Sequence, residues 1–275
     1  MPMLIILGGL AGLKLAPSAA LATFPPSVQM LAGLFAAAPF SWFMGRFGRK
    51  AGFYIGGAFA CIGGIIGTLA LFQSSFLLLC IAHMALGAAL SCYQYFRFAA
   101  AEVVSEQWQP VAISLMLTSG LVAAFAGPQI FILAKDYFTA APLAGAYAAI
   151  SILTLIGLLP LAFVRISAPQ SVTRKTPIDR AAALAILRRG PVLSAVIIGA
   201  ASQAIMVLLM APTPLAMIGH GFSEAVAGDV IRWHVVAMFA PSFFTGFLIK
   251  RFGTKPIVPY CISDTVVLIL VLLFP

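Results

Sequence analysis

The chain is 275 residues long; 62% of its residues are apolar and 8% are charged, its mean hydropathy is +1.09 and its net charge is +9. Soluble domains are about 45–50% apolar and about 25% charged, so this chain has too few polar residues to cover a water-exposed globule. The composition excludes a soluble enzyme, a nucleic-acid-binding domain, a disordered chain and a secreted disulfide scaffold. It favours a membrane protein with several spans, and the continuous apolar runs indicate helices rather than a β-barrel.

The apolar runs between charged clusters predict the spans in chain order, since a helix needs about 20 apolar residues to cross a bilayer. A weak first segment covers 3–22, where Lys14 and Pro17 interrupt the apolar run as if only the second half of a helix were present. Eight stronger segments follow at 27–44, 51–72, 76–101, 110–134, 141–164, 191–218, 226–249 and 256–274. Three of them open on a proline, where the missing N–H costs nothing: Pro110, Pro191 and Pro256.

Lysine and arginine divide unequally between the two sides that these nine spans define. The loops of one side hold twelve of the sixteen basic residues, the loops of the other side hold three, and Arg97 lies within a span. Cytoplasmic loops collect basic residues. The loops predicted to be cytoplasmic are 45–50, 102–109, 165–190 and 250–255.

The basic run 165–190 is the long polar stretch of the chain and predicts its division into parts. A transmembrane bundle at 1–164 precedes this cytoplasmic linker, and a second group of spans at 191–275 follows it. Within the linker, 179–189 has the pattern of an amphipathic helix that lies on the anionic lipid surface.

Two similar turns stand at equivalent positions along the chain. The sequence GRFGRK at 45–50 follows the second span, and KRFGTK at 250–255 follows the eighth. Gly253 follows Gly48 by 205 residues, and six spans separate the two turns. A six-helix unit repeated in parallel, with the substrate between the copies, is one way in which transporters are built.

The first turn resembles the loop signature of the major facilitator superfamily, which reads roughly G-x-x-x-D-R-x-G-R-K between the second and third helices. Ser41 replaces the first glycine of this signature and Gly45 replaces its aspartate. The matching positions are Arg46, Gly48, Arg49 and Lys50. The resemblance implies a conformational role for this turn.

The second turn is a partial copy of the same signature. Gly246 restores the first glycine, whereas Lys250 stands at the position of the aspartate. In the family that acidic residue helps to hold the two halves together on the cytoplasmic side, and neither copy has it here. The matching positions of the second copy are Arg251, Gly253 and Lys255.

Two helix signatures of the same family match in part. The fourth-helix pattern R-x-x-x-G is present from His83 to Gly87, with histidine in place of arginine. The fifth-helix pattern G-x-x-x-G-P, which is associated with antiporters, is matched by Gly127 and Pro128, with Ala123 in place of the first glycine.

The resemblance implies an all-α integral membrane protein, a helical bundle of the superfamily's type with about nine transmembrane helices. Members normally have twelve, so we expect a complete N-terminal six-helix bundle less part of its first helix, and about three helices of the C-terminal bundle. The chain would then be truncated at both ends. The resemblance also implies secondary active transport of a small solute across the cytoplasmic (inner) membrane by alternating access.

The fourth span carries a polar stripe, because His83, Gln94 and Arg97 fall on one side of a helix that turns about 100° per residue. Charged groups inside a bilayer are costly, which makes them candidates for function. Arg97 could hold an anionic substrate group, Gln94 could hydrogen-bond the substrate and His83 could carry a proton. In the alternative, Arg97 extends to the cytoplasmic surface and pairs with Glu102.

The seventh span places four candidate cavity residues on one face. Pro212 and Pro214 are expected to break the helix just beyond them, and broken helices expose backbone groups at transport sites. The alternative is a proline kink whose methionines are ordinary packing. The four residues are Gln203, Met206, Met210 and Thr213.

The last two spans add further candidates. Asp229 and Arg232 are expected to form an ion pair near the outer surface, and Trp233 fits the interfacial aromatic belt. His234 is a second candidate for proton coupling, or a histidine that contacts neighbouring helices. Asp264 lies well inside the ninth span, where a carboxylate needs a partner or carries protons.

The sequence has no Walker phosphate loop, HExxH motif or nucleophile elbow, so we expect neither an enzyme nor an ATP-driven pump, and no cofactor or metal. The expected partners are a small-molecule substrate of unknown identity, protons and the lipid bilayer, with no nucleic acid, and the chain is expected to be a monomer. The alternative is a non-transporting membrane fragment or interaction protein derived from a transporter. Uptake and efflux both stay open.

Overall fold

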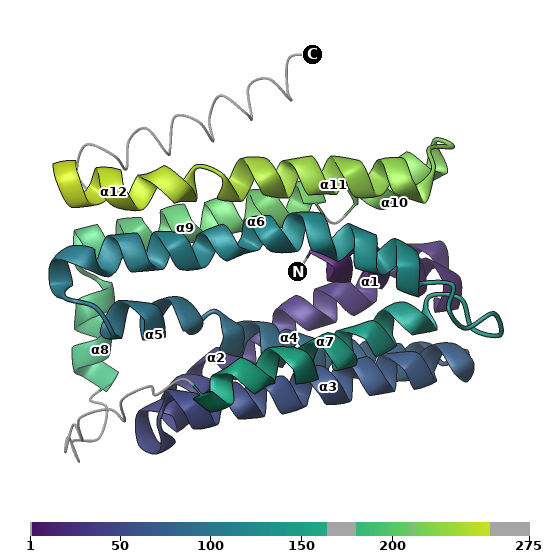
Figure 1. Cartoon of the computed structure of the whole chain (residues 1–275), viewed down its shortest axis with the longest axis horizontal. Coiled ribbons are helices and arrows are strands. Elements are labelled where there is room, and N and C mark those ends of the chain that lie inside the picture. Colours follow the sequence, from purple (N-terminus) through teal and green to yellow (C-terminus); the bar gives the residue numbers. More distant parts are fainter. Residues whose placement is uncertain (1, 164–179, 211, 254–275) are drawn as a thin grey trace.

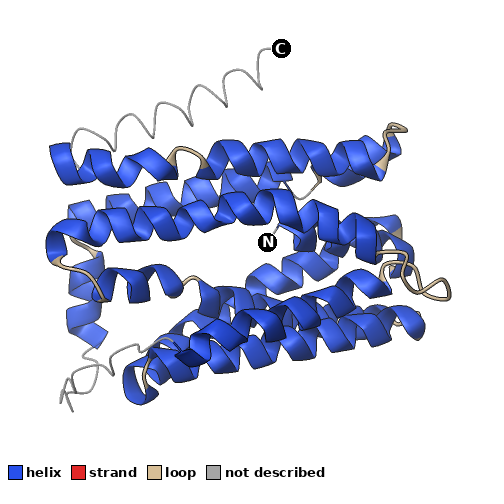
Figure 2. Cartoon of the chain, in the orientation of Figure 1, coloured by secondary structure: helices blue, strands red, loops and turns tan. Residues whose placement is uncertain are grey.

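The computed structural model describes residues 2–163, 180–210 and 212–253, and every regular element in these ranges is a helix (Figures 1 and 2). Seven helical segments are long and apolar enough to cross a membrane. They coincide with the predicted spans from 27–44 through 226–249, which confirms the expected all-α, multi-pass architecture. The predicted span 256–274 lies outside the described residues.

The first helix, α1 (Pro2–Leu15), is shorter than the segment predicted at 3–22. It ends two residues before Pro17, whose ring disfavours the helical conformation of the residue before it. A short 3-10 turn, η1 (Ala19–Leu21), leads into the next helix. Leu7 and Ala11 of α1 are fully buried in the main apolar core, so this short helix is central to the molecule.

Four helices form one layer of the molecule: α2 (Phe24–Phe47), α3 (Arg49–Phe72), α4 (Phe76–Tyr93) and α7 (Ala144–Phe163) (Figure 1). Helix α3 packs between α4 and α7. Glycines let these helices approach closely. A Cβ atom added at Gly64 would lie 2.2 Å from Oγ of Ser151, and one at Gly63 would lie 2.8 Å from Cγ of Leu86.

A second layer is built around α6 (Gln109–Ala134), which follows the short helix α5 (Phe96–Glu102) and the turn η2 (Glu106–Trp108). Helix α6 packs along α11 (Glu224–Phe239) and α12 (Ser242–Phe252), so it joins the chain before the predicted linker to the chain after it. Ser114 makes the closest junction. Its hydroxyl accepts a 2.8 Å hydrogen bond from the N–H of Gly246 and donates one to the carbonyl of Ser242.

The remaining helices follow the linker. Helix α8 (Arg180–Leu187) stands where the amphipathic segment 179–189 was expected, and its place on the lipid surface stays a prediction. Helices α9 (Gly190–Met210) and α10 (Thr213–Gly219) are separate, as the prolines at 212 and 214 predicted. The division into 1–164, 165–190 and 191–275 also stays a prediction, because 164–179 and 254–275 lie outside the described residues.

Candidate functional site

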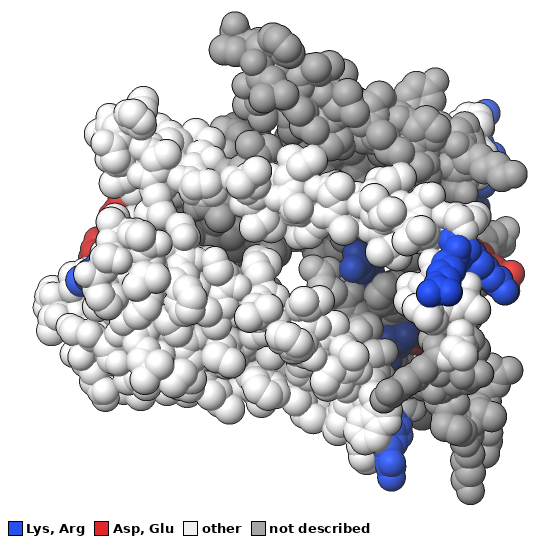
Figure 3. Space-filling model, turned by 180° about the vertical axis from the view of Figure 1, so that it is seen from behind, with Lys and Arg blue, Asp and Glu red and all other residues white. Residues whose placement is uncertain are grey.

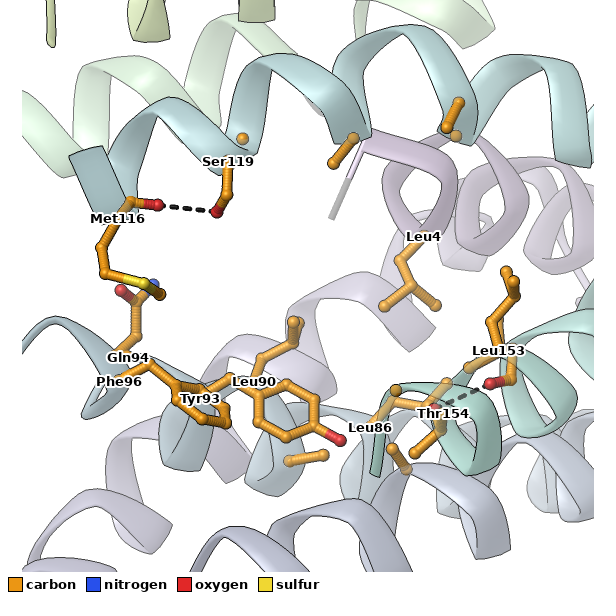
Figure 4. A pocket seen from close by; sticks show the side chains of 18 of the residues that line it. Leu4, Leu86, Leu90, Tyr93, Gln94, Phe96, Met116, Ser119, Leu153 and Thr154 are labelled. Carbon is orange, nitrogen blue, oxygen red and sulfur yellow. Dashed lines mark hydrogen bonds between the residues drawn. The ribbon is translucent and has the colours of Figure 1, made fainter. Parts of the chain in front are cut away.

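A cavity of about 670 Å³ lies between the two layers (Figure 4). Helix α6 forms one wall, and α4, α5 and α7 form the opposite wall. The described lining residues precede the linker, apart from Phe239 of α11. Most of them are apolar, and the polar ones are Tyr93, Gln94, Arg97, Ser119 and Thr154.

A break between α4 and α5 places two of these polar residues. The span predicted at 76–101 is present as one membrane-crossing segment, Phe76–Glu102, with a short turn at 94–95 between α4 and α5. There the N–H of Tyr95 bonds the carbonyl of Cys92, three residues back, at 3.1 Å. The Tyr95 hydroxyl donates to the carbonyl of Ala37 at 2.9 Å, which holds the break against α2. His83 therefore lies on α4 and Arg97 on α5, one on each side of this turn.

Arg97 lines the cavity, and one nitrogen of its guanidinium group is buried without a hydrogen-bond partner among the described residues. This nitrogen is Nε, and the Cζ atom of Arg97 lies 5.3 Å from the ring centre of Phe98. The alternative pairing with Glu102 is contradicted, because Glu102 accepts hydrogen bonds from Nε and an Nη of Arg49. Arg97 is thus available to a ligand.

Aromatic rings and hydroxyls that the sequence analysis missed complete the site. Phe96 stacks on Phe53 with ring centres 3.8 Å apart and planes within 6° of parallel. The ring of Phe53 therefore holds that of Phe96 in position. The Tyr93 hydroxyl points along the cavity toward Thr154, and Ser119 lies across from them on α6 (Figure 4). Tyrosine and phenylalanine in apolar spans read as packing, so the sequence carried no signal for them apart from their nearness to Gln94 and Arg97.

His83 lies inside the helix layer, and the cavity lining does not include it within the described part of the chain. Its Nδ1 is 2.8 Å from Oε1 of Gln29 and its Nε2 is 2.7 Å from the hydroxyl of Tyr147. An amide oxygen only accepts, so Nδ1 carries the hydrogen and Nε2 accepts from Tyr147. Gly8 of α1 approaches the same ring, since an added Cβ would lie 2.6 Å from Cε1 of His83.

The four candidates of the seventh span are not brought to this cavity, as far as the described residues define its lining. Met210 is buried in the main apolar core, Met206 packs against that core, and Gln203 is exposed. Thr213 begins α10. The helix break expected beside them is present, and the membrane-crossing segments Phe76–Glu102 and Glu224–Phe252 are interrupted as well.

The later candidates also lie away from the described lining. Asp229 and Arg232 form the expected ion pair at 2.7 Å, and Trp233 is exposed. His234 is half-buried on α11, and Asp264 lies outside the described residues. At the same end of the molecule Lys135 contacts Glu224, and this hydrogen bond raises the pKa of the Lys135 ammonium.

Three curated proteins resemble the chain over most of its length. The riboflavin transporter RfnT of Brucella anthropi is 38% identical over 260 residues, which cover 93% of this chain and 64% of the relative. Two uncharacterized MFS-type transporters of Bacillus subtilis, YddS and YdeG, are 32% and 29% identical over 226 and 222 residues. Each of these matches covers 76% of this chain and about half of the relative.

The abbreviation in those names stands for the major facilitator superfamily, whose loop signature the sequence resembles at both turns of its repeat. The chain belongs to the major facilitator superfamily. It spans between half and two thirds of the length of these curated relatives. No family model matches the chain, and no solved structure matches it significantly.

The two turns that resemble the superfamily's loop signature have the same local geometry. Gly48 closes α2 with φ 89° and Gly253 closes α12 with φ 78°, a region that favours glycine. Their N–H groups bond the carbonyls of Met44 and Ile249, each four residues back, at 3.0 and 2.8 Å. Similar sequence therefore produces the same helix ending in both copies.

The basic residues of these superfamily turns make different contacts. Arg46 lies over the ring of Trp42, whereas Arg49 binds Glu102 and Lys50 donates to the carbonyl of Ala162 at 2.8 Å. In the second copy, Lys250 lies over the ring of Trp108 and Arg251 over that of Phe252. Lys255 lies outside the described residues.

The superfamily's fifth-helix signature falls on α6. Gly127 lines the cavity, and Pro128 is buried within the helix. This signature therefore contributes to the wall opposite Tyr93 and Gln94.

Proposed function

We propose that this protein is a secondary active transporter that moves riboflavin, or a solute of the same class, across the cytoplasmic membrane. The observation that carries this proposal is the similarity to a riboflavin transporter over 93% of the chain, combined with a cavity of about 670 Å³ between the two helix layers. Small-molecule sites have volumes of about 300–1,000 Å³, so the cavity suits a solute of that size.

The substrate-binding residues that we propose are those that meet at the break between α4 and α5. Gln94 and Arg97 line the cavity there, and discontinuous helices are typical of transporter binding sites. Gln203, Met206, Met210 and Thr213 flank the break between α9 and α10 and are proposed to line another part of the solute's path. This arrangement suits alternating access, with the solute bound between moving layers.

Proton coupling is a further part of the proposal, with His83, His234 and Asp264 as its candidates. Both ring nitrogens of His83 have hydrogen-bond partners, and the Tyr147 hydroxyl would change from donor to acceptor if Nε2 took up a proton. His234 is half-buried on α11.

The orientation that we propose places the two repeated turns in the cytoplasm, together with 102–109 and 165–190. Figure 3 supports it, because Lys and Arg side chains gather toward one end of the molecule. This end includes Arg46, Arg49 and Lys250, whose turns and helix ends lie together through the contacts with Glu102 and Trp108. Cytoplasmic ends of membrane helices are rich in such residues.

The test is a flux measurement in vesicles that contain the purified protein. Riboflavin is placed inside or outside, a pH gradient of either sign is imposed, and the vesicle content is followed by riboflavin fluorescence. We expect saturable, protein-dependent flux in at least one direction, which a protonophore slows. Equal flux with and without protein would overturn the transport proposal. An unchanged rate with the protonophore would overturn proton coupling alone.

A further inference from the structure

The described lining of the cavity carries a positive charge and no negative charge. Arg97 is the single charged residue among its described lining residues. The described carboxylates lie elsewhere, and four of them are already paired with basic partners: Glu102, Asp136, Glu224 and Asp229. Glu106 lies in the turn η2 and is also absent from the described lining. The cavity therefore carries one positive charge that the described protein does not balance.

The chemistry of Arg97 selects a hydrogen-bond acceptor. A guanidinium group has five N–H donors, no acceptor, and stays protonated in proteins. Since its Nε has no partner among the described residues, a ligand that presents carbonyl or anionic oxygens would satisfy it. Ligands that present only donors or only apolar surface would leave it unsatisfied.

The possible acceptors differ in how much negative charge they would bring into the cavity. A phosphate ester carries a charge of about −1.5 to −2 at neutral pH, which a single guanidinium does not neutralise. Because the rest of the lining is mainly apolar, the excess charge would be poorly solvated. A carbonyl oxygen on an uncharged ring can accept from Arg97 without bringing any charge that needs a second partner.

The walls of the cavity favour a flat ring. Phe96, fixed by its stack on Phe53, and Tyr93 form an aromatic surface beside Arg97. On the facing wall α6 presents small residues, including Gly120 and Ala123, which leave room between the walls. Aromatic surfaces prefer to stack on flat rings.

Two hydroxyls complete the description of the walls. Ser119 donates to the carbonyl of Met116 at 2.6 Å, and Thr154 donates to that of Ile150 at 2.7 Å. Their hydrogens are therefore in use, whereas their oxygens can still accept hydrogen bonds. A solute that carries hydroxyl groups on a side chain could donate to both walls.

From these features we infer that the cavity binds an uncharged, flat heteroaromatic ring through a carbonyl edge held by Arg97, and discriminates against phosphorylated forms of the same solute. The inference rests on the proposed transport function and deepens it, because it specifies which part of a riboflavin-like solute is recognised. Arg97 acts here as a residue that determines specificity, with Phe96 and Tyr93 stacking on the ring.

The test compares three probes on the purified protein in lipid nanodiscs: riboflavin, riboflavin 5′-phosphate, and lumichrome, which keeps the ring but lacks the hydroxylated side chain. Binding is followed by the fluorescence of each probe. We expect riboflavin to bind at least about 10-fold more tightly than its phosphate, and lumichrome to bind measurably. A hydrogen bond to a charged group corresponds to roughly 10- to 150-fold in affinity, so Arg97→Gln should weaken riboflavin binding by that factor.

Two variants serve as controls. Arg97→Lys keeps the charge but loses the planar fork of donors, so it should also weaken binding, though less than Arg97→Gln. Lys14→Gln removes a positive charge from the exposed end of α1, away from the described lining, and should leave affinity unchanged. Thermal unfolding of each variant separates loss of binding from loss of fold.

The outcomes separate the inference from the proposed function. If the wild-type protein binds riboflavin and Arg97→Gln binds it equally well, the role of Arg97 is wrong and the transport proposal stands. If the phosphate binds as tightly as riboflavin, the discrimination is wrong. If the wild-type protein binds none of the three probes, the riboflavin-class proposal fails, and this inference fails with it.

Discussion

The Nε2 atom of His83 lies 2.7 Å from the hydroxyl of Tyr147, and this contact closes a buried chain of polar groups from Gln29 through His83. It lies where α1, α2, α4 and α7 meet. The superfamily signature has arginine at this position. No described carboxylate contacts His83, so the hydrogen bonds to Gln29 and Tyr147 are what satisfy the polar atoms of this buried ring.

Removing the Tyr147 hydroxyl should destabilise the protein, because Nε2 of His83 would be left buried without a donor. The cost of an unsatisfied buried polar group is about 1–3 kcal/mol. We expect Tyr147→Phe to lower the midpoint of thermal unfolding in detergent. Tyr137→Phe makes the same chemical change on an exposed side chain and should leave the midpoint where it is. Equal midpoints for both variants would show that this hydrogen bond contributes nothing.

Gly64 tests the close packing of α3 against α7. A Cβ atom there would lie 2.2 Å from Oγ of Ser151 and 2.8 Å from the backbone carbonyl oxygen of Tyr147, so Gly64→Ala must push the two helices apart. Overpacking of this kind costs about 1–3 kcal/mol. Gly199→Ala is the matched control, since nothing lies within 4 Å of its added Cβ. Thermal unfolding that is unaffected by Gly64→Ala would contradict the packing of these helices.

The spans could be predicted from the sequence because hydropathy and basic clusters are properties of the chain itself. The same holds for the break between α9 and α10, which two prolines produce, and for the ion pair of Asp229 with Arg232, which helical spacing produces. The turns at Gly48 and Gly253 could also be predicted, because the positive φ angles found there favour glycine.

The break between α4 and α5 could not be predicted in this way. It has no proline or glycine, and it depends on contacts with distant residues: the Tyr95 hydroxyl with Ala37, and the ring of Phe96 with Phe53. The burial of His83 likewise depends on Gln29 and Tyr147, which lie 54 and 64 residues away along the chain. Residue spacing along one helix does not contain this information.

The ion pair of Arg49 with Glu102 fixes the end of α5 to the start of α3. Its carboxylate is more than half exposed, and exposed pairs stabilise proteins by only about 0–1 kcal/mol, so stability should hardly change when it is broken. Because the contact positions α5 at the cavity, we expect Arg49→Glu to slow solute flux. The double variant Arg49→Glu with Glu102→Arg should restore much of the rate. A double variant as slow as the single one would argue against this positioning role.

Gly246 tests the junction between the chain before the linker and the chain after it. A Cβ atom there would lie 2.5 Å from Cβ of Ser114 and 2.7 Å from the backbone carbonyl oxygen of Pro110. We expect Gly246→Ala to separate α12 from α6 and to lower the unfolding midpoint more than Ser114→Ala, which removes hydrogen bonds without adding atoms. Gly219→Ala, whose added Cβ meets nothing within 4 Å, is the control. A larger effect of Ser114→Ala would show that hydrogen bonding, not shape, determines this junction.

The orientation in the membrane can be measured with single cysteines at the two ends of the molecule. Phe47 lies at the turn that is proposed to be cytoplasmic, and Tyr137 lies just beyond the far end of α6; both side chains are exposed. Since basic residues are retained in the cytoplasm, a membrane-impermeant thiol reagent added to intact cells should label Tyr137→Cys and not Phe47→Cys. Disrupting the membrane should make Phe47→Cys reactive, and the unaltered protein measures labelling of its native cysteines. The reverse pattern would invert the orientation, and labelling of both in intact cells would mean that these two ends lie on the same side, against the predicted topology.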